Sequence, residues 1–142
     1  AALEAMAEKM ADTYDQNILL DIAPEVVSEL EMDKQGVIFY IIEEAITNAR
    51  KHAEAEHVWI RLKPMQNDMG FLEIQDDGLG FDVKSVTASY EHRGSLGMIN
   101  LRERTDLVNG VLKIDSTPGV GTHIQVAIPL TEEAVDRLRH SV

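Results

Sequence analysis

The segment Val37–Ala53 (VIFYIIEEAITNARKHA) constrains the fold of this chain most, because it contains two helical patterns at once. Its apolar residues recur at steps of three and four, the spacing of one face of an α-helix. This apolar face consists of Ile38, Ile41, Ile42, Ala45, Ile46 and Ala49. A helix with such a face must pack against a hydrophobic core, so the rest of the chain has to supply that core.

A second, polar stripe runs along the same helix. Glu44 and Asn48 are four residues apart, and Lys51 and His52 follow three and four residues later, so all four share one ridge. A carboxylate, an amide, an ammonium and an imidazole in one row offer a base, an oxygen ligand for a metal and two phosphate contacts. The stripe therefore predicts nucleotide chemistry. Two alternatives stay open: Glu44 as a structural ion-pair partner of Lys51 or Arg50, and His52 as a buried, hydrogen-bonded histidine.

Composition limits the possible partners. The chain has 142 residues, so we expect one domain, 1–142, with a proper core. Lys plus Arg number 13 against 25 Asp plus Glu, and the formal charge of −12 argues against nucleic acid and anionic membranes. The same charge repels a polyphosphate, so an ATP site would need a divalent cation and a local cluster of donors. The chain has no cysteine, which excludes disulfides and thiolate metal sites, and it begins with Ala, which suggests a piece of a longer protein.

Hydrophobic periodicity predicts the remaining elements. Strands are expected at 17–23, 56–63, 69–75, 111–116 and 122–129. Further helices are expected at 2–13, 94–109 and 131–140. Residues 24–36 are acidic and irregular, with room for one short helical turn, and the polar segment 82–93 is expected to be a mobile loop. This order predicts an α+β fold: a two-layer sandwich with helices on one face of a mixed, mostly antiparallel sheet.

Individual residues predict where these elements start and stop. Asp33 is a plausible N-cap of the central helix, and Thr131 is the expected N-cap of the last one. Pro24 and Pro64 are expected to end the first two strands, because proline cannot donate to a sheet ladder. Gly110 is expected at the C-cap of helix 94–109.

Three glycine-containing segments suggest a ligand site. Asp76-Asp77-Gly78-Leu79-Gly80 follows a strand directly; its glycines would let a flat ligand lie against the backbone, and its first carboxylate could accept the amine of adenine. Taken alone, the segment is better explained as an ordinary Asp-Gly turn. Gly94-Ser95-Leu96-Gly97 opens a helix and would present backbone N–H groups to an anion, or it is a flexible loop before a helix. Gly119-Val120-Gly121-Thr122, taken alone, predicts a hairpin turn.

The segments EEAITNARKHA, IQDDGLGFD, GSLGMINLRER and STPGVGTHIQVAIPL occur in this order. Together they resemble the catalytic and ATP-binding domain (HATPase_c) of a sensor histidine kinase, more narrowly its nitrate-sensor and DesK-like branch. That domain belongs to the Bergerat-fold, or GHKL, ATPases together with gyrase, Hsp90 and MutL. The resemblance covers residues 15–130 and implies the same fold, with ATP and Mg²⁺ as cofactors.

By position, the resemblance implies a role for each matching residue. Asn48 would ligate Mg²⁺, Glu44 would act as the catalytic base, and Lys51 and His52 would contact phosphates. The glycines expected near the phosphates are Gly94 and Gly97.

The remaining matches concern the base and the borders of the domain. Asp76 would recognise adenine above Gly78 and Gly80, and Thr122 would support adenine through a water molecule. The resemblance implies an ATP lid at 82–94 and assigns no role to Tyr90, His92, Arg102 or Arg104. Outside its range, the expected borders of the domain are an N-terminal helix at 1–14 and a C-terminal helix at 131–142.

The implied function is transfer of the γ-phosphoryl group of Mg-ATP to a histidine on a separate dimerisation domain, followed by transfer to a response regulator. None of the 5 histidines lies in the phosphoacceptor pattern, so the chain should be the isolated catalytic half, monomeric by itself within a homodimeric parent protein. The resemblance also implies a cytoplasmic domain, in a parent protein that can be membrane-anchored through its sensor region. Two alternatives share the fold: a nucleotide-gated binding module, and a serine kinase of the anti-sigma-factor type.

Overall fold

The computed structural model describes Ala5, Lys9 and residues 17–51, 55–66, 68–80 and 93–140; for residues 50, 51, 93–99 and 140 it describes the backbone alone. In chain order the elements are β1 (Asn17–Ile22), α2 (Pro24–Glu29), α3 (Met32–Lys51), β2 (His57–Met65), β3 (Met69–Asp76), α5 (Arg93–Leu107), β4 (Val111–Thr117), β5 (Gly121–Pro129) and α6 (Glu132–His140). The predicted helix 2–13 lies outside the described residues except for Ala5 and Lys9, which are helical, and the predicted loop 82–93 lies outside them except for Arg93.

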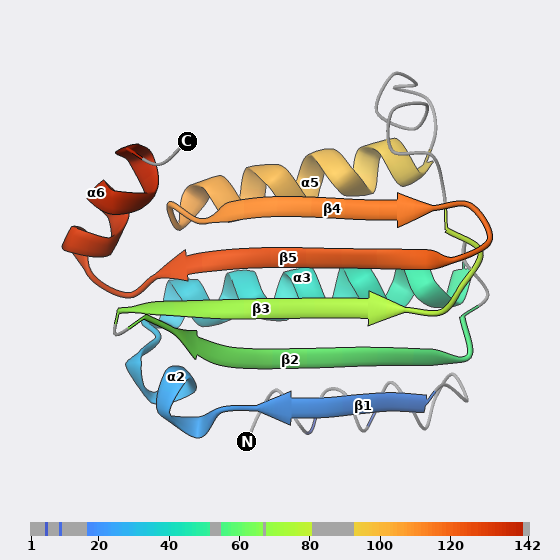
Figure 1. Ribbon diagram of the computed structural model, residues 1–142, viewed down its shortest axis with the longest axis horizontal. Helices are drawn as coiled ribbons and strands as arrows, with labels where there is room; N and C mark the ends of the chain where they lie inside the picture. Colours follow the sequence, from blue (N-terminus) through green and yellow to red (C-terminus); the bar gives the residue numbers. More distant parts are fainter. Residues whose placement is uncertain are drawn as a thin grey trace.

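The strands form one five-stranded sheet in the order β1-β2-β3-β5-β4. β1 and β2 are parallel, whereas the other three neighbouring pairs are antiparallel. Helices α3 and α5 cover the same face of the sheet and run in opposite directions, and α6 lies beside the end of β5 (Figure 1). The predicted α+β sandwich with a mixed, mostly antiparallel sheet is therefore confirmed. No helix among the described residues is long and apolar enough to cross a membrane.

The strand register arranges the helix-covered face of the sheet in rows. One apolar row consists of Ile22, Leu62, Leu72, Val126 and Leu112. The next consists of Leu20, Ile60, Ile74, Ile124 and Ile114. These rows pack in one core with the apolar face of α3, whose isoleucines are almost fully buried. The row beyond them changes character: Ile18, Val58, Asp76, Thr122 and Ser116. Three neighbouring core-facing positions are thus polar at this end of the sheet.

The central helix starts earlier than its sequence pattern predicts. It begins at Met32, so Asp33 lies in the first turn and is not the N-cap; its Oδ1 accepts the backbone N–H of Lys34 at 2.9 Å. Two hydrogen bonds hold this extra turn: Lys34 Nζ donates to the carbonyl of Pro129, far along the chain, at 3.0 Å, and Gln35 Nε2 donates to that of Leu30, just before the helix, at 3.0 Å. The short helix α2 and the first residues of α3 together replace most of the predicted irregular segment.

Pro64 does not end its strand, contrary to the prediction. β2 continues to Met65, and Pro64 pairs with Gly70 of β3. The reason is the length of the neighbouring strand: β1 pairs with β2 only as far as Leu62. Beyond Leu62, β2 has no paired strand on this side among the described residues. The missing N–H of Pro64 therefore costs the sheet no hydrogen bond there.

The C-terminus of α5 also differs from the prediction. The helix ends at Leu107, and the residue with left-handed backbone is Asn109 (φ 59°), not Gly110. The N–H of Asn109 donates to the carbonyl of Asp106 at 3.1 Å, and that of Gly110 donates to the carbonyl of Thr105 at 3.0 Å, the pattern of a Schellman cap. Gly110 is needed for space, since a Cβ there would lie 2.9 Å from Thr105 Cγ2.

The last helix matches its prediction. The N–H of Ala134 donates to Thr131 Oγ1 at 3.1 Å, so Thr131 is the N-cap of α6. Arg137 of α6 forms an ion pair with Asp68, in the turn between β2 and β3. This pair raises the pKa of Arg137 and lowers that of Asp68. The helix is thereby tied to the end of the sheet that lies away from the polar row.

Candidate functional site

The segments that carry the predicted site residues meet at one end of the molecule. The C-terminal ends of α3 and β3, the turn between β4 and β5, and the N-terminal end of α5 all lie at this end (Figure 1). The polar row of the sheet also lies at this end of the molecule, because Asp76 is the last residue of β3 and pairs with Thr122 near the start of β5. The structure therefore brings together elements that are far apart in the sequence.

Asp76 occupies a core-facing position and is only partly exposed. Its Oδ1 accepts the backbone N–H groups of Gly78 at 2.9 Å and of Thr122 at 3.3 Å. Burial raises the pKa of this carboxyl despite those two hydrogen bonds, and the neighbouring Asp77 adds to the increase. Within the described part of the chain, nothing donates to Oδ2. One carboxylate oxygen is thus held by the backbone while the other remains a free acceptor.

Thr122 and Ser116 continue the polar row beside this carboxylate. Their hydroxyl oxygens are 2.8 Å apart, and the hydroxyl of Ser116 also donates to the carbonyl of Gly121 at 3.2 Å. Either hydroxyl can be the donor of the bond between them, and in both cases Thr122 Oγ1 keeps lone-pair capacity as an acceptor. Gly121 packs directly behind the site, since a Cβ on it would lie 2.2 Å from the carbonyl oxygen of Asp76.

The glycine segment after β3 rests on the turn between β4 and β5. The N–H of Gly119 donates to the carbonyl of Leu79 at 2.6 Å. Gly80 has left-handed backbone (φ 67°), and a Cβ on it would lie 2.2 Å from the carbonyl oxygen of Thr117. Glycine is required here by both conformation and space. The hairpin turn predicted at 119–122 is present, and it also supports the segment that contains Gly78 and Gly80.

Asp77 anchors the other side of this segment, and sequence reasoning missed its role. Its Oδ1 accepts the backbone N–H groups of Glu56 and His57, both at 2.9 Å, and its Oδ2 lies 2.8 Å from His57 Nδ1. Desolvation raises the pKa of Asp77, but the hydrogen bonds from His57 and Glu56 together bring it below its ordinary value. The ring of His57 stacks on that of Trp59, with centroids 5.6 Å apart. The only hint in the sequence is the Asp-Asp doublet.

The polar ridge of α3 faces toward α5. Glu44 and Asn48 are partly exposed and one helical turn apart. One turn before Glu44, the ring of Tyr40 lies 4.7 Å from the guanidinium carbon of Arg104 on α5, a cation–π contact. Because the helices are antiparallel, the C-terminal part of α3 lies beside the N-terminal part of α5 (Figure 1). Lys51 and His52, the other two ridge residues, have no described side chains.

The two lid glycines occupy different positions in α5. The helix begins at Arg93, so Gly94 is among the first four residues, whose N–H groups have no partner within the helix. Gly97 is the fifth residue, and its N–H is used inside the helix. The anion contact predicted for this end of α5 is thus available at Gly94, while Gly97 can contribute only a close approach of the backbone.

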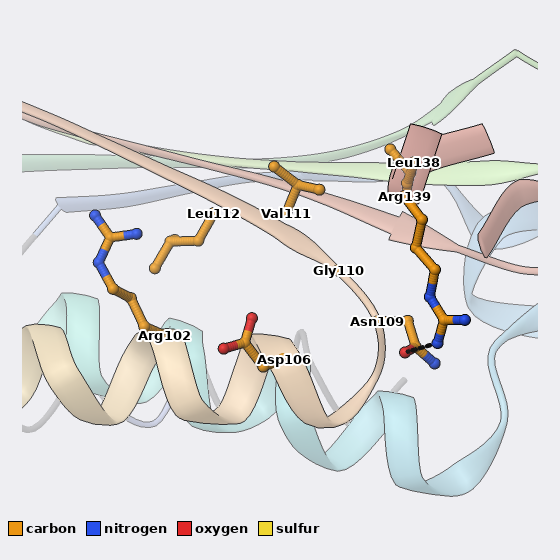
Figure 2. A pocket seen from close by; sticks show the side chains of 8 residues that line it. All are labelled: Arg102, Asp106, Asn109, Gly110, Val111, Leu112, Leu138 and Arg139. Carbon is orange, nitrogen blue, oxygen red and sulfur yellow. Dashed lines mark hydrogen bonds between the residues drawn. The ribbon is translucent and has the colours of Figure 1, made fainter. Parts of the chain in front are cut away.

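No group of three or more His, Cys, Asp or Glu residues that could hold a metal ion occurs within the described ranges. A hollow of about 420 Å³ lies at the opposite end of the molecule, between α5, β4 and α6. It is lined by Arg102, Asp106, Asn109, Gly110, Val111, Leu112, Leu138 and Arg139 (Figure 2). Arg139 reaches across it to Asn109 at 3.4 Å. None of the predicted site residues lines this hollow.

The fold and the polar row define a class of ATP-binding proteins, and comparison with known families agrees. The chain belongs to the family described as "Histidine kinase-, DNA gyrase B-, and HSP90-like ATPase", whose model matches residues 33–132. ATP binding follows from that membership.

Curated relatives narrow the class to sensor histidine kinases. The chain is 50% identical over 96 residues to an uncharacterized sensor-like histidine kinase of Chloroflexus aurantiacus, covering 68% of this chain and 16% of that protein. It is 37% identical over 94 residues to the histidine-protein kinase/phosphatase DegS of Bacillus subtilis, covering 66% of this chain and 24% of DegS. The oxygen sensor histidine kinase NreB of Staphylococcus carnosus is 32% identical over 99 residues, 69% of this chain and 27% of NreB. The predicted histidine kinase catalytic domain is confirmed, and the chain spans about a quarter or less of these relatives.

Solved structures support the fold. The histidine kinase domain of the blue-light activated kinase from Erythrobacter litoralis matches with a TM-score of 0.73 at 20% identity, covering 93% of this chain and 61% of that one. The mycobacterial sensor histidine kinase MprB matches with a TM-score of 0.68 at 16% identity, covering 89% of this chain and 92% of that one.

Proposed function

We propose that this domain binds Mg-ATP at the polar end of its sheet and transfers the γ-phosphoryl group to a histidine on a separate dimerisation domain. The observation that carries the proposal is the Asp76 carboxylate. Two backbone N–H groups hold its Oδ1, burial raises its pKa, and none of the described residues donates to its Oδ2. A half-buried acceptor without a donor is costly in a folded protein, and the exocyclic amine of adenine would supply that donor.

Around this carboxylate the neighbouring residues would complete the base site. Gly78 and Gly80 would lie beneath the purine ring, where a Cβ would obstruct it. Gly80 and Gly121 already allow backbone contacts that no other residue would tolerate. Thr122 keeps acceptor lone pairs that suit a bridging water molecule.

The residues available for the phosphates fit a magnesium ion better than a transition metal. Asn48 offers an amide oxygen, the ligand type that Mg²⁺ prefers, with phosphate oxygens and water for the remaining positions. Bound Mg-ATP supplies the group to be transferred and neutralises the charge that a chain of −12 would otherwise repel. Glu44, one turn before Asn48, would act as base toward the accepting histidine, and Lys51, His52 and the N-terminal turn of α5 at Gly94 and Gly97 would contact phosphates. The lid assigned to 82–94 stays a prediction, because 81–92 lie outside the described residues.

The partners follow from this activity. The accepting histidine would belong to a dimerisation domain of the same parent protein, and a response regulator would receive the phosphoryl group from it. The relatives support this assignment because they are named as sensor histidine kinases. By itself the domain would be monomeric and would act in the cytoplasm, where ATP is available, with any membrane anchor in a sensor region of the parent protein.

Thermal stabilisation by ATP, with and without Mg²⁺, tests nucleotide binding in the wild type and in Asp76→Asn. In Asp76→Asn, the backbone N–H groups should hold the amide oxygen at the position of Oδ1. The NH₂ group would then take the position of Oδ2 and face the amine of adenine, so that two donors oppose each other. We expect about 10- to 100-fold weaker binding, from about 1–3 kcal/mol for an unsatisfied pair. Asp115→Asn, on the exposed strand β4, is the matched control. Equal stabilisation of all three proteins by ATP would refute the adenine assignment.

Phosphotransfer is tested by mixing the domain with a histidine-bearing dimerisation domain and radiolabelled ATP. An acid-labile phosphohistidine is expected, and Glu44→Gln should slow its formation while leaving ATP binding unchanged. Tight ATP binding without any transfer would favour a nucleotide-gated binding module. Acid-stable phosphoserine on a protein substrate would favour the serine-kinase alternative.

A further inference from the structure

We propose that Asp77 and His57 form a latch that holds Asp76 in place and thereby sets the affinity for the nucleotide. The proposal rests on the nucleotide site described above and assigns it two positioning residues. Neither side chain needs to touch the ligand. Their contribution is to fix the segment directly after Asp76, from which the N–H of Gly78 holds the Asp76 carboxylate.

The latch continues the sheet where its backbone ladder stops. β2 and β3 pair as far as Val58 and Asp76. One residue further, the side chain of Asp77 takes over the pairing: its carboxylate accepts two backbone N–H groups at the start of β2, from Glu56 and His57. The N–H of Asp77 also approaches the carbonyl of His57 at 3.4 Å. The chain leaving β3 is therefore fastened to β2 mainly through one carboxylate.

The contacts on the other side of Asp76 do not replace this fastening. Toward β5, its carboxylate has one hydrogen bond, from the N–H of Thr122, and that bond is long at 3.3 Å. The bond from Gly78 is local and moves with the segment. The next firm contact is between Leu79 and Gly119, at 2.6 Å and three residues further along the chain. The backbone of Asp76 itself is paired with Val58 and Thr122, so the loss of Asp77 would act through the segment that follows. With Gly78 less firmly placed, its N–H would no longer hold Oδ1, and the carboxylate could turn away from the orientation in which Oδ2 meets adenine.

His57 contacts Oδ2, the second carboxylate oxygen of Asp77, and its own ring stacks on that of Trp59. Its Nδ1 lies 2.8 Å from Asp77 Oδ2, and its imidazole stacks on Trp59 with an interplanar angle of 17°. The side chains of His57 and Asp77 are 38% and 35% exposed, so they are surface groups and not part of the core. Exposed ion pairs of this kind add little to the free energy of folding. An effect on nucleotide affinity can therefore be separated from an effect on stability.

Three variants and one control test the latch by isothermal titration with ATP and Mg²⁺, together with melting temperatures measured without ligand. Asp77→Ala removes every side-chain bond of Asp77, Asp77→Asn keeps an oxygen for the two backbone N–H groups, and His57→Ala removes the contact with Asp77 Oδ2 together with the stack on Trp59. The control, Asp21→Ala, breaks an exposed ion pair with Lys63 on the same sheet, away from the nucleotide site.

We expect Asp77→Ala to weaken ATP binding about tenfold or more, while its melting temperature falls no further than that of Asp21→Ala. Asp77→Asn should restore affinity to within about threefold of the wild type, and His57→Ala should lie between. In the transfer reaction, Asp77→Ala should raise KM for ATP with little change in kcat, as expected when binding and not the chemical step is affected.

The latch is refuted if wild type binds ATP and Asp77→Ala binds it equally well, or if Asp77→Asn fails to recover affinity. Failure of the wild type itself to bind ATP would instead contradict the proposed nucleotide site. If Asp77→Ala does not fold, Asp77→Asn and His57→Ala are compared with the control instead. If both variants bind ATP as tightly as the wild type, the contact between His57 and Asp77 does not influence affinity, and the role of His57 is overturned.

Discussion

Replacing Gly121 by alanine should be among the most damaging single-methyl changes in this chain. Gly121 has φ 135°, a backbone conformation almost restricted to glycine, which costs other residues about 1–3 kcal/mol. Its new Cβ would lie 2.2 Å from the carbonyl oxygen of Asp76, a backbone atom that cannot rotate away. Overpacking of this kind adds about 1–3 kcal/mol. The sum of about 2–6 kcal/mol is a large part of the roughly 5–15 kcal/mol that stabilises a domain.

Two other glycines separate the contributions. Gly119 lies two residues earlier, with φ 82° and no atom within 4 Å of the position that a methyl group would take, so Gly119→Ala should show the conformational cost alone, about 1–2 kcal/mol. Gly36 lies inside α3, likewise with nothing within 4 Å. Gly36→Ala should stabilise the domain by about 0.5–1 kcal/mol, because alanine is the better helix former.

Urea denaturation of the three variants gives the free energies of unfolding, provided that the m-values agree with that of the wild type. From the most to the least stable protein, the expected order is Gly36→Ala, wild type, Gly119→Ala and Gly121→Ala. Because the clash displaces Asp76, Gly121→Ala should also bind ATP more weakly than Gly119→Ala under conditions in which both are folded. If Gly121→Ala is no less stable than Gly119→Ala, the close packing of the turn against β3 does not constrain this position, and the reasoning fails.

Two further predictions concern the site. Burial raises the pKa of Asp76 above 3.8, and adenine needs the ionised form, so ATP affinity should decrease on acidification from a higher pH than for an ordinary aspartate. The effect of acidification on folding has the opposite sign: the raised pKa means that the charged carboxylate destabilises the folded state, and this cost is relieved as pH falls through that pKa. Both effects are measured by following ATP affinity and the free energy of unfolding in urea as a function of pH. A double-mutant cycle with Tyr40→Leu and Arg104→Met should give a coupling free energy of about 0.5–1 kcal/mol, and a value near zero would show that this cation–π contact does not hold α5 on α3.

Most of the fold could be predicted from local patterns, and the errors have tertiary causes. The strands and the central helix follow from residue spacing, which is a local property. The start of α3 could not be found in the same way, because its first turn precedes the apolar pattern and Lys34 in that turn is held by Pro129, 95 residues further along the chain. The prediction for Pro64 was wrong because its tolerance depends on the length of a neighbouring strand. At the end of α5 the prediction named Gly110, whereas Asn109 has the left-handed backbone and Gly110 is needed for its close contact with Thr105.

The site was less predictable than the fold, for a different reason. Asp76 and the glycines after it form a recognisable local motif, and their assignment needed no register. The part played by Asp77 depends on β2 and β3 ending together, so that its carboxylate meets the N–H groups of Glu56 and His57. No spacing rule connects positions 57 and 77, and only the paired strands reveal them as neighbours.

The register also explains why we place the proposed nucleotide site at this end of the sheet. Asp76, Thr122 and Ser116 are each unremarkable as polar residues at the ends of strands. Aligned across β3, β5 and β4, they fill core-facing positions directly beyond two apolar rows. A carboxylate in such a position is costly to bury, and its raised pKa shows that the backbone hydrogen bonds do not remove the cost. A sheet that needed only stability would place an apolar residue there, so the persistence of an acceptor with one free oxygen is a reason to look for a donor from outside the chain.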